Sequence, residues 1–508
     1  MIKNGIIFLF CSIIAKLLSY VWEAFIASHL GISESADAFY MATGILNILY
    51  PMIDLGIWKV FLPIYKQSIS SNDYKKTDKI ANISITLFLC LSVLLVIFFI
   101  FFADLLVAVM APGFTIVKKT ITVECLRIAA LSYLLMAATT VISAMLQSHE
   151  RFFGYQMREI INHVTKILYV YFCFDYLGIY AVASAIIVGG IFRFLIQLPF
   201  MNWTWNFKFD FRFLAPEIIP MLKGLPAVAF TTAITQINAM VGRMLASAAT
   251  TGAVACLNYG NKLMNVFSGM VSGAIATVTY PKIIQYIAER KTSELRNLLS
   301  EVVTALSLII IPISLFCSIY SKDLVQLAFQ RGKFDTIAVQ LTSSVFTGYC
   351  LGMLFVGLTT IITNVFYAFG DTRITLFISI IEVVCNIVLN YCLFPTYGVI
   401  TVAYAASFSA ILTFSIRMYF LKFYVKLNYK SIVEEICKIF IVSGLSVAIS
   451  VLASQFIQSH VFYRLLCAVS VNLLVFLFLT HFLRIKAIIF VWNIVHNKIE
   501  KFTNRKRK

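Results

Sequence analysis

The stretch IANISITLFLCLSVLLVIFFIFFA, residues 80–103, decides the fold class because it contains no charged side chain. About 20 apolar residues in a helix are enough to cross the roughly 30 Å hydrocarbon core of a bilayer. Similar apolar windows recur along the whole chain of 508 residues, which is 60% hydrophobic and only 13% charged. A soluble domain carries about 25% charged residues. We therefore predict an all-α polytopic membrane protein.

The apolar windows predict about fourteen transmembrane helices, with no connection long enough to hold a separate soluble domain. Their expected ranges are 5–29, 38–64, 80–103, 122–146, 158–175, 179–201, 225–247, 253–280, 298–320, 341–367, 374–394, 399–421, 433–455 and 462–483. The last residues, 486–508, form a basic tail. We expect this tail to rest on anionic lipid at the cytoplasmic surface, which attracts clustered Lys and Arg.

The net charge of +18 is distributed by loop. Lys and Arg gather in every second connection, for example in 65–79 and 281–297, whereas 175–178 and 394–398 contain neither. This asymmetry is the positive-inside pattern. It predicts a multi-pass protein of the cytoplasmic (inner) membrane with both termini inside, and it gives no reason to expect nucleic acid as a partner.

Two features of the sequence each occur twice, and the shift between the two copies is nearly the same for both features. Asn47 precedes Pro63 by 16 residues, and Asn265 precedes Pro281 by the same 16, a shift of 218. Separately, YLGIYAVASA (176–185) resembles TYGVITVAYA (396–405) at a shift of 220. Two independent matches at nearly the same shift indicate an internal duplication of the chain.

The duplication predicts two homologous six-helix lobes, 1–215 and 216–430, followed by two extra helices in 431–485. Because six is an even number, both copies enter the membrane in the same direction, and a pseudo-twofold axis along the membrane normal should relate them. Transporters with such parallel repeats bind their substrate near the bilayer midplane. The predicted architecture is that of a transporter.

Polar side chains recur at helical spacing inside several predicted spans. A charge at the centre of a spanning helix costs roughly 2.5–3.5 kcal/mol on insertion scales. Hydrogen bonding between helices would explain most of the Asn and Ser residues. Lys16 and Lys262, however, lie mid-span, one in each predicted lobe. Because Lys suits phosphate as a point charge, we predict a cationic cavity that takes an anionic ligand.

The residues that we expect to line this cavity share mid-span positions on polar helix faces. They are Lys16, Glu23, Asn47, Asp54, Arg243, Asn258, Asn261, Lys262 and Asn265. Glu23 follows Lys16 by seven residues on the same face and is expected to orient it. Lys59 and Arg193 lie nearer the expected membrane edge, where long basic side chains reach the interface.

Chemical motifs of enzymes are absent from the sequence. There is no GxxxxGK[ST], GxSxG, HExxH or dinucleotide-binding fingerprint. The eleven cysteines form no CxxC pair, so neither a disulfide framework nor a metal site is indicated. We predict a protein that is not an enzyme and has no cofactor, and whose transport is coupled to membrane potential or a monovalent cation.

Seven segments, in order along the chain, carry a family resemblance. They are LGISESADAFYMATGILNIL (30–49), APGF (111–114), QLP (197–199), GLPAVAFTTAITQIN (224–238), FQRGKF (329–334), FYAFGDTR (366–373) and NIVLNYCLFPTYGVITVAYAASFSA (386–410). The set resembles the MurJ/MviN family, the bacterial lipid II flippases of the multidrug/oligosaccharidyl-lipid/polysaccharide exporter superfamily. The resemblance implies fourteen helices, with the last two forming a groove for the lipid tail.

The resemblance also bears on the candidate site. The family uses several cavity arginines, and this sequence has Lys16 and Lys262 at two of those positions. Trp22 and Tyr50 stand at two others and carry no charge. The acidic residue that opens the second span of the family is present as Asp37, which joins the candidate substrate-binding residues. Arg243 is the compensating cation that we expect.

The expected function is therefore the flipping of lipid II, an undecaprenyl-pyrophosphate-linked peptidoglycan precursor, by alternating access. Expected partners are this lipid-linked oligosaccharide and membrane lipids, with cell-wall synthesis proteins as a further candidate. Three alternatives stay open at this point. They are a paralogous flippase for O-antigen or exopolysaccharide precursors, a cation-coupled drug antiporter of the same superfamily, and a membrane scaffold without transport.

Overall fold

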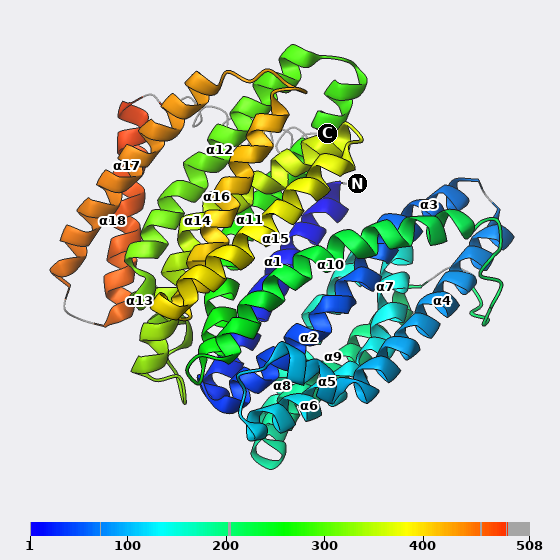
Figure 1. Cartoon of the computed structure of the whole chain (residues 1–508). Coiled ribbons are helices and arrows are strands. Elements are labelled where there is room, and N and C mark those ends of the chain that lie inside the picture. The colour runs from blue at the N-terminus through cyan, green and yellow to red at the C-terminus, as the bar shows by residue number, and fades with distance from the viewer. Residues whose placement is uncertain (1, 72, 202–204, 458–459, 484, 486–508) are drawn as a thin grey trace. The chain divides into compact units, whose positions relative to one another are not determined.

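A computed structural model describes residues 2–71, 73–201, 205–457, 460–483 and 485. Within these ranges the chain is helical and contains no strand, as predicted. Contacts divide it into two compact units. Unit 1 comprises the residues up to Ala255 together with Arg331–Asp335, and unit 2 comprises Cys256–Gln330 and the residues from Thr336 onward. Figure 1 shows the helices of both units.

Unit 1 contains ten α-helices, a π-helical turn and a 3-10 turn within its described residues. They are α1 (Ile2–Leu30), α2 (Glu34–Gly56), η1 (Ile57–Phe61), α3 (Leu62–Ser70), α4 (Tyr74–Phe101), α5 (Ala103–Met110), α6 (Ile116–Ala130), α7 (Tyr133–Ser148), α8 (Phe152–Leu177), α9 (Ile179–Leu195), η2 (Leu198–Phe200) and α10 (Ile219–Ser247). Unit 1 also holds the first three residues of α11 (Ala253–Ala288). Side chains that accept backbone N–H groups start several of these helices: Ser33 starts α2, Asp73 starts α4 and Thr115 starts α6.

The other described helices belong to unit 2. They are the rest of α11, α12 (Thr292–Ile319), α13 (Ser321–Phe329), α14 (Thr336–Ala368), α15 (Thr372–Tyr397), α16 (Ile400–Leu421), α17 (Tyr429–Gln455) and α18 (Val461–Phe482). The last two lie side by side in Figure 1 and pack on α12 through apolar clusters, of which Phe316, Val447 and Leu465 are members. The groove for a lipid tail that we expect at α17 and α18 stays a prediction.

The internal repeat is visible in the backbone turns. Gly178 and Gly398, 220 residues apart, both have positive φ and both donate their N–H to the carbonyl four residues earlier at 2.8 Å. Glu150 and Gly370, also 220 apart, both have positive φ after α7 and α14. The short helices α5 and α13 begin with equivalent hydrogen bonds at a shift of 218. The segments that repeat in sequence thus form matching turns at the same shift, and the two homologous six-helix lobes stay a prediction.

Contacts group the helices differently from the sequence repeats. The second repeat was predicted to begin at 216, yet α10 packs on α2, within unit 1. The compact units are defined by contacts between helices, whereas the predicted division follows the repeat in the sequence. The contacts therefore do not test the division into 1–215, 216–430 and 431–485, which stays a prediction. The basic tail, 486–508, lies outside the described residues.

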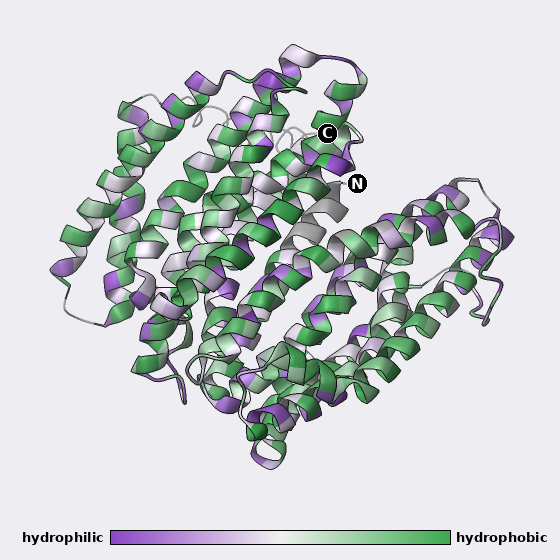
Figure 2. Ribbon diagram, in the orientation of Figure 1, coloured by the Kyte–Doolittle hydropathy of each residue, from purple (hydrophilic) through white to green (hydrophobic). Residues whose placement is uncertain are grey.

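Each of the fourteen predicted spans coincides with a helix or a bent helix pair, and the long helices are mostly hydrophobic in Figure 2. By length and hydropathy, 12 helices could cross a membrane, or up to 13 if the bent pair α6 and α7 is one span. The charged helix α8 is not among them. The multi-pass fold is confirmed, and the number fourteen stays a prediction.

Candidate functional site

The polar face of α1 carries an exposed lysine, Lys16. The Lys16 side chain is exposed, and among the described residues it has no hydrogen bond or ion pair. Four residues earlier, Ser12 accepts a hydrogen bond from Gln156 of α8 at 2.6 Å. A lysine within a candidate span, Cys11–Leu30, needs a hydrated or anionic environment. Lys16 therefore has the properties expected of a ligand-binding cation.

Glu23 has a different environment from Lys16. It is buried and accepts a hydrogen bond from the Tyr40 hydroxyl of α2 at 2.9 Å. The expected pairing of Glu23 with Lys16 is not seen in this conformation, because no ion pair reaches Lys16 from any described residue. Seven residues along a helix place two side chains on one face but about 10 Å apart, which is too far for direct contact.

The candidate residues of α2 form more hydrogen bonds and ion pairs near the two ends of the helix than near its middle. Asn47, near the middle, is exposed and has no hydrogen-bond partner among the described residues. Further along, Asp54 accepts a hydrogen bond from Thr140 of α7 at 3.0 Å. Tyr50 lies between them and meets the Tyr133 ring edge-on at 5.7 Å. Asn47 is thus the α2 residue best placed to bind a ligand.

Asp37, near the start of α2, is fully occupied by protein groups. Its side chain is 2% exposed and forms an ion pair with Lys118 of α6 at 3.1 Å. It also accepts the N–H groups of Gly252 at 2.7 Å and Ala255 at 3.0 Å. These N–H groups lie at the N-terminus of α11, where backbone N–H groups have no carbonyl partner within the helix and a carboxylate is favourable. The geometry favours a structural role for Asp37, and its predicted contact with substrate remains untested.

Arg243 of α10 lies against a glycine of α2. A Cβ atom added to Gly44 would lie 2.1 Å from Nη1 of Arg243, far inside van der Waals contact. The missing side chain at position 44 therefore makes room for the guanidinium group. This contact explains why α10 brings a cation so close to the α2 backbone.

A buried charged cluster in unit 1 was not among the predicted site residues. Glu159 of α8 pairs with Arg193 of α9 at 2.7 Å and with Arg158 at 3.3 Å. Both arginines are buried, at 6% and 8% exposure. The guanidinium carbon of Arg158 also lies 4.7 Å from the Tyr155 ring centre. The expectation that Arg193 extends to the membrane edge is wrong, because an acidic partner on the neighbouring helix holds it inside the protein.

The sequence contained a signal for this cluster. The predicted spans 158–175 and 179–201 are separated by a turn of only a few residues, so their helices must lie antiparallel and in contact. Glu159 and Arg193 are opposite charges near the far ends of these two helices. Pairing the charges of adjacent spans across the Gly178 turn would have found the ion pair.

In unit 2 the candidate residues form a ladder on α11. Asn265 is exposed and donates to Asn261 Oδ1 at 2.7 Å, one turn earlier. Lys262 is also exposed. Asn258, one turn before Lys262, is buried at 9% exposure. The structure thus places Asn261, Lys262 and Asn265 on one accessible stretch of α11, as the helical spacing predicted.

A second polar group of unit 2 lies between α15 and α16. Arg417 is buried at 3% exposure and pairs with Glu382 at 3.3 Å. One turn apart on α15, Asn390 donates to Asn386 at 2.8 Å, and both are buried. Arg417 Nε and Nη1 have no hydrogen-bond partner among the described residues. This group therefore has unused hydrogen-bonding capacity inside the unit.

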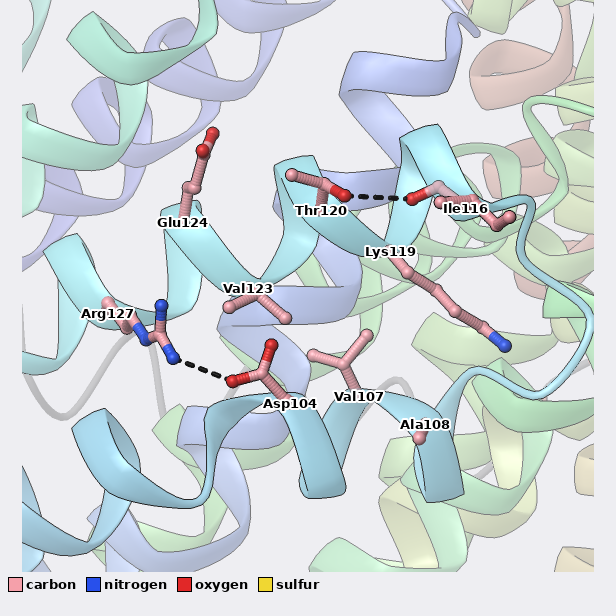
Figure 3. A pocket seen from close by; sticks show the side chains of 9 residues that line it. All are labelled: Asp104, Val107, Ala108, Ile116, Lys119, Thr120, Val123, Glu124 and Arg127. Carbon is pink, nitrogen blue, oxygen red and sulfur yellow. Dashed lines mark hydrogen bonds and ion pairs between the residues drawn. The ribbon is translucent and has the colours of Figure 1, made fainter.

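A hollow of about 300 Å³ lies elsewhere in unit 1, between α5 and α6 (Figure 3). Its lining includes the exposed ion pair of Asp104 with Arg127, at 2.7 Å, together with Lys119 and Glu124. None of the predicted site residues lines it. Among the described residues, no group of three or more His, Cys, Asp or Glu side chains could hold a metal ion.

With this geometry in place, comparison with known proteins identifies the family. The family model described as "Lipid II flippase MurJ" matches residues 26–478. The chain belongs to the lipid II flippase MurJ family. The match covers the helices that carry Asn47, Arg243 and Lys262, and it begins after Lys16.

Individual relatives agree with the family model. The chain is 25% identical over 441 residues to the probable lipid II flippase MurJ of Vibrio cholerae, covering 82% of each chain. It is 23% identical over 407 residues to the corresponding protein of Buchnera aphidicola, covering 79% of each. It is also 24% identical over 402 residues to the lipid II flippase MurJ of Burkholderia cenocepacia, covering 76% of this chain and 77% of that one.

Solved structures support the fold. A lipid II flippase MurJ in an inward closed conformation matches with a TM-score of 0.81 at 20% identity, over 94% of this chain and 99% of that one. A multidrug resistance MATE family transporter of the MOP superfamily matches with a TM-score of 0.68 at 16% identity, over 80% of this chain and 93% of that one. At these identities the likeness shows the fold that a MurJ family member shares with multidrug transporters, and nothing about substrate.

Proposed function

We propose that this protein is a flippase that moves lipid II from the inner to the outer leaflet of the cytoplasmic membrane for peptidoglycan synthesis. Membership of the MurJ family over residues 26–478 carries this proposal. The relatives quoted above are named for lipid II and not for another glycan lipid. The resemblance to multidrug transporters concerns the fold alone, so the antiporter alternative has no support from a substrate-level observation.

Physical chemistry sets what such a protein must provide. The sugar hydroxyls and pyrophosphate of lipid II cannot cross hydrocarbon unaided, because each polar group without a hydrogen-bond partner costs several kcal/mol there. The side chains of Lys16, Asn47, Lys262 and Asn265 are exposed and that of Asn261 is half-buried, and all five lie on candidate spanning helices. They supply cations for the pyrophosphate and amides for the sugar, while the polyprenyl chain stays in lipid.

The proposal assigns separate roles to the candidate residues. Lys16 and Lys262 neutralise the pyrophosphate, each as a single point charge without the paired donors of arginine. Arg243 adds a third cation. Glu23 remains a candidate for contacting the head group in another conformation of the transport cycle, because in this one it is bonded to Tyr40. Asp54 is a weaker candidate, because Thr140 already occupies one carboxylate oxygen.

Three further parts of the proposal concern energy, orientation and partners. Transport by alternating access would draw on membrane potential or a monovalent cation, since one charge moved through 100 mV is worth about 2.3 kcal/mol. Both termini are proposed to lie in the cytoplasm, following the loop charges. Cell-wall synthesis proteins that make or use lipid II are proposed as partners.

Complementation tests the substrate. Bacteria depleted of their own lipid II flippase should grow when this chain is produced in their membrane. A variant with both Lys16→Ala and Lys262→Ala should reach the membrane in equal amount and fail to support growth. Failure of the well-expressed natural chain, combined with rescue of a strain that lacks another undecaprenyl-linked glycan flippase, would reassign the substrate.

A further inference from the structure

An aromatic segment of unit 1 is not explained by the flippase proposal. Between η2 and α10 the chain reads WNFKFDFRF over residues 205–213, with an aromatic residue at every second position. We call residues 205–213 the aromatic strap. Phe207, Phe209 and Phe211 are exposed at 41%, 65% and 64%. Four consecutive ring pairs along the strap have centroids 4.9–6.3 Å apart.

The strap is held against α4 by specific hydrogen bonds. Asn82 of α4 donates to the carbonyl of Asn206 at 3.2 Å and accepts the indole N–H of Trp205 at 3.1 Å. One turn further along α4, Thr86 accepts the backbone N–H of Asp210 at 3.1 Å. Both α4 side chains are buried. The strap is therefore a fixed structural element, and its exposed rings belong to an ordered surface.

The opposite edge of the strap is open. Among the described residues, no hydrogen bond is formed by the backbone N–H groups of Phe207, Phe209 and Phe211. Backbone groups without partners do not occur in contact with the hydrocarbon core, where no water can satisfy them. The strap must therefore lie at a depth where water or lipid head groups reach it.

The aromatic rings set the opposite limit on depth. A contiguous row of exposed phenylalanine rings is unfavourable in water and marks an interaction surface. The strap also joins two candidate spans, because TM-length helices end at Phe200 and begin at Ile219. Trp gathers at the boundary between head groups and acyl chains, and Phe is a typical apolar residue of amphipathic segments that lie in this interface. The open backbone edge and the exposed rings together favour this boundary.

The charges between the rings favour the same placement. Lys208, Asp210 and Arg212 alternate with the aromatic residues and give the strap a net charge of +1. Asp210 is paired with Arg212 at 2.6 Å, which leaves Lys208 without an ion pair among the described residues. A basic side chain next to interfacial aromatic rings suits anionic phospholipid head groups.

We propose that the aromatic strap is a lipid-binding surface that lies along the interface of one leaflet, the cytoplasmic one in the predicted topology. Its phenylalanine rings insert between the upper acyl chains, and Lys208 contacts lipid phosphate. Because Asn82 and Thr86 tie the strap to α4, this contact fixes the depth of α4 in the membrane. The proposed ligand of the strap is bulk phospholipid, not the transported lipid.

Photocrosslinking tests this placement. The benzophenone amino acid p-benzoylphenylalanine would replace Phe209 in one variant, Phe211 in a second and Arg212 in a third. Each purified variant is reconstituted into vesicles of phosphatidylethanolamine and phosphatidylglycerol that contain radiolabelled phospholipid, and is then irradiated. Arg212 is the matched control because it is exposed, adjacent in sequence to Phe211 and on the opposite face of the extended chain. It is paired with Asp210 and has no assigned contact with lipid phosphate.

The proposal predicts that label is transferred to the chain at Phe209 and Phe211 and that much less is transferred at Arg212, where the probe points away from the acyl chains. Equal labelling at all three positions would overturn the one-sided insertion. In whole cells, irradiation of the Phe209 variant should give no adduct with another protein. A discrete protein adduct there, with no lipid label in vesicles, would make the strap a protein-docking strand and would also overturn the proposal.

Discussion

Lys16 and Asp37 are both charged residues in helices of unit 1, and their surroundings differ completely. Lys16 is exposed without an ionic partner among the described residues, whereas the Asp37 side chain is 2% exposed and has three protein donors. A buried charge is tolerated when it is paired and hydrogen-bonded. An unpaired charge inside a membrane must find its partner elsewhere. Substrate is the partner that we propose for Lys16.

The pairing of Asp37 with Lys118 predicts a specific pattern of stability. Asp37→Asn should destabilise the protein by about 3–5 kcal/mol, because it leaves Lys118 buried without a counter-charge. Adding Lys118→Met should recover part of the loss, since the buried charge is then removed. Thermal unfolding of the purified protein in detergent measures both changes. If the Asp37→Asn variant has the same melting temperature as the unsubstituted protein and loses only transport, Asp37 is a substrate ligand and not a structural cap.

The contact of Gly44 with Arg243 predicts a displacement without unfolding. Gly44→Ala adds a Cβ at a site 2.1 Å from Arg243 Nη1, and the flexible arginine side chain should move away while the helices stay in place. Transport should then fall to the level of Arg243→Ala, and the double variant should be no worse than either single one, because both changes remove one interaction.

Transport rates and melting temperatures of the three variants check this. If Gly44→Ala transports at the rate of the unsubstituted protein while Arg243→Ala is inactive, the position of the guanidinium against Gly44 is unimportant for transport.

Residue positions inside spans could be predicted better than their partners. Helical spacing correctly placed Asn261, Lys262 and Asn265 on one stretch of α11. It could not tell that Asp37 meets the N-terminus of α11, since those residues lie more than two hundred positions apart. Partners distant in sequence depend on how helices pack, and a single sequence does not encode that in any local pattern.

At the scale of elements, the turn between α14 and α15 shows how a helix start is stabilised. Asp371 accepts the N–H groups of Arg373 and Ile374 at 3.0 and 3.1 Å and a hydrogen bond from the Tyr424 hydroxyl. This hydroxyl lowers the pKa of the Asp371 carboxyl below its ordinary value of 3.8. The same bond raises the pKa of Tyr424 above its ordinary value of 10.0.

These two shifts predict a stability plateau for the turn. A carboxyl with a lowered pKa stabilises the folded state above its ordinary pKa, and the contribution is lost as pH falls through the lowered value. A tyrosine with a raised pKa contributes below its ordinary pKa, and that contribution is lost as pH rises through the raised value. The turn should therefore resist opening between these limits and weaken in strong acid and strong base.

Hydrogen exchange of the first turn of α15, followed over pH, measures this. Tyr424→Phe should lower protection across the plateau and move the acidic limit to higher pH, because the Asp371 carboxyl loses the hydrogen bond that lowers its pKa. The alkaline limit should disappear, because no hydroxyl is left at position 424 to ionise. Tyr419→Phe, a nearby tyrosine that does not contact Asp371, serves as the control. An unchanged profile in Tyr424→Phe would show that the hydrogen bond does not hold the turn.

Long helices were predicted well because hydropathy specifies them, and their interruptions were missed. The window 122–146 gave no sign that α6 and α7 meet at a 40° bend. Likewise, 38–64 concealed the π-helical turn Ile57–Phe61. The short helices α5 and α13 lie between the predicted spans, where hydropathy indicates no helix. Such breaks depend on one or two backbone hydrogen bonds and leave the apolar pattern unchanged, so hydropathy cannot reveal them.

At the scale of the whole molecule, each unit supplies one candidate lysine, although the two positions are 246 residues apart and are not equivalent in the repeat. Unit 1 carries an exposed lysine on α1, and unit 2 carries one on α11. A pyrophosphate bears about two negative charges, since each phosphate has one strongly acidic site, so two lysines suffice to neutralise it. Family resemblance identified the substrate class that residue chemistry alone left as an anionic ligand. The roles of individual residues remain proposals of this account.

The most direct test of the central claim is lipid II flipping by the purified protein in vesicles. Fluorescent lipid II would be placed in the inner leaflet and its arrival outside measured with a quencher that cannot cross the membrane. The account predicts flipping by the natural chain, retained flipping by Lys16→Arg, and loss of flipping by Lys16→Ala and by Lys262→Ala at unchanged melting temperature. Flipping at the natural rate by both alanine variants would contradict it.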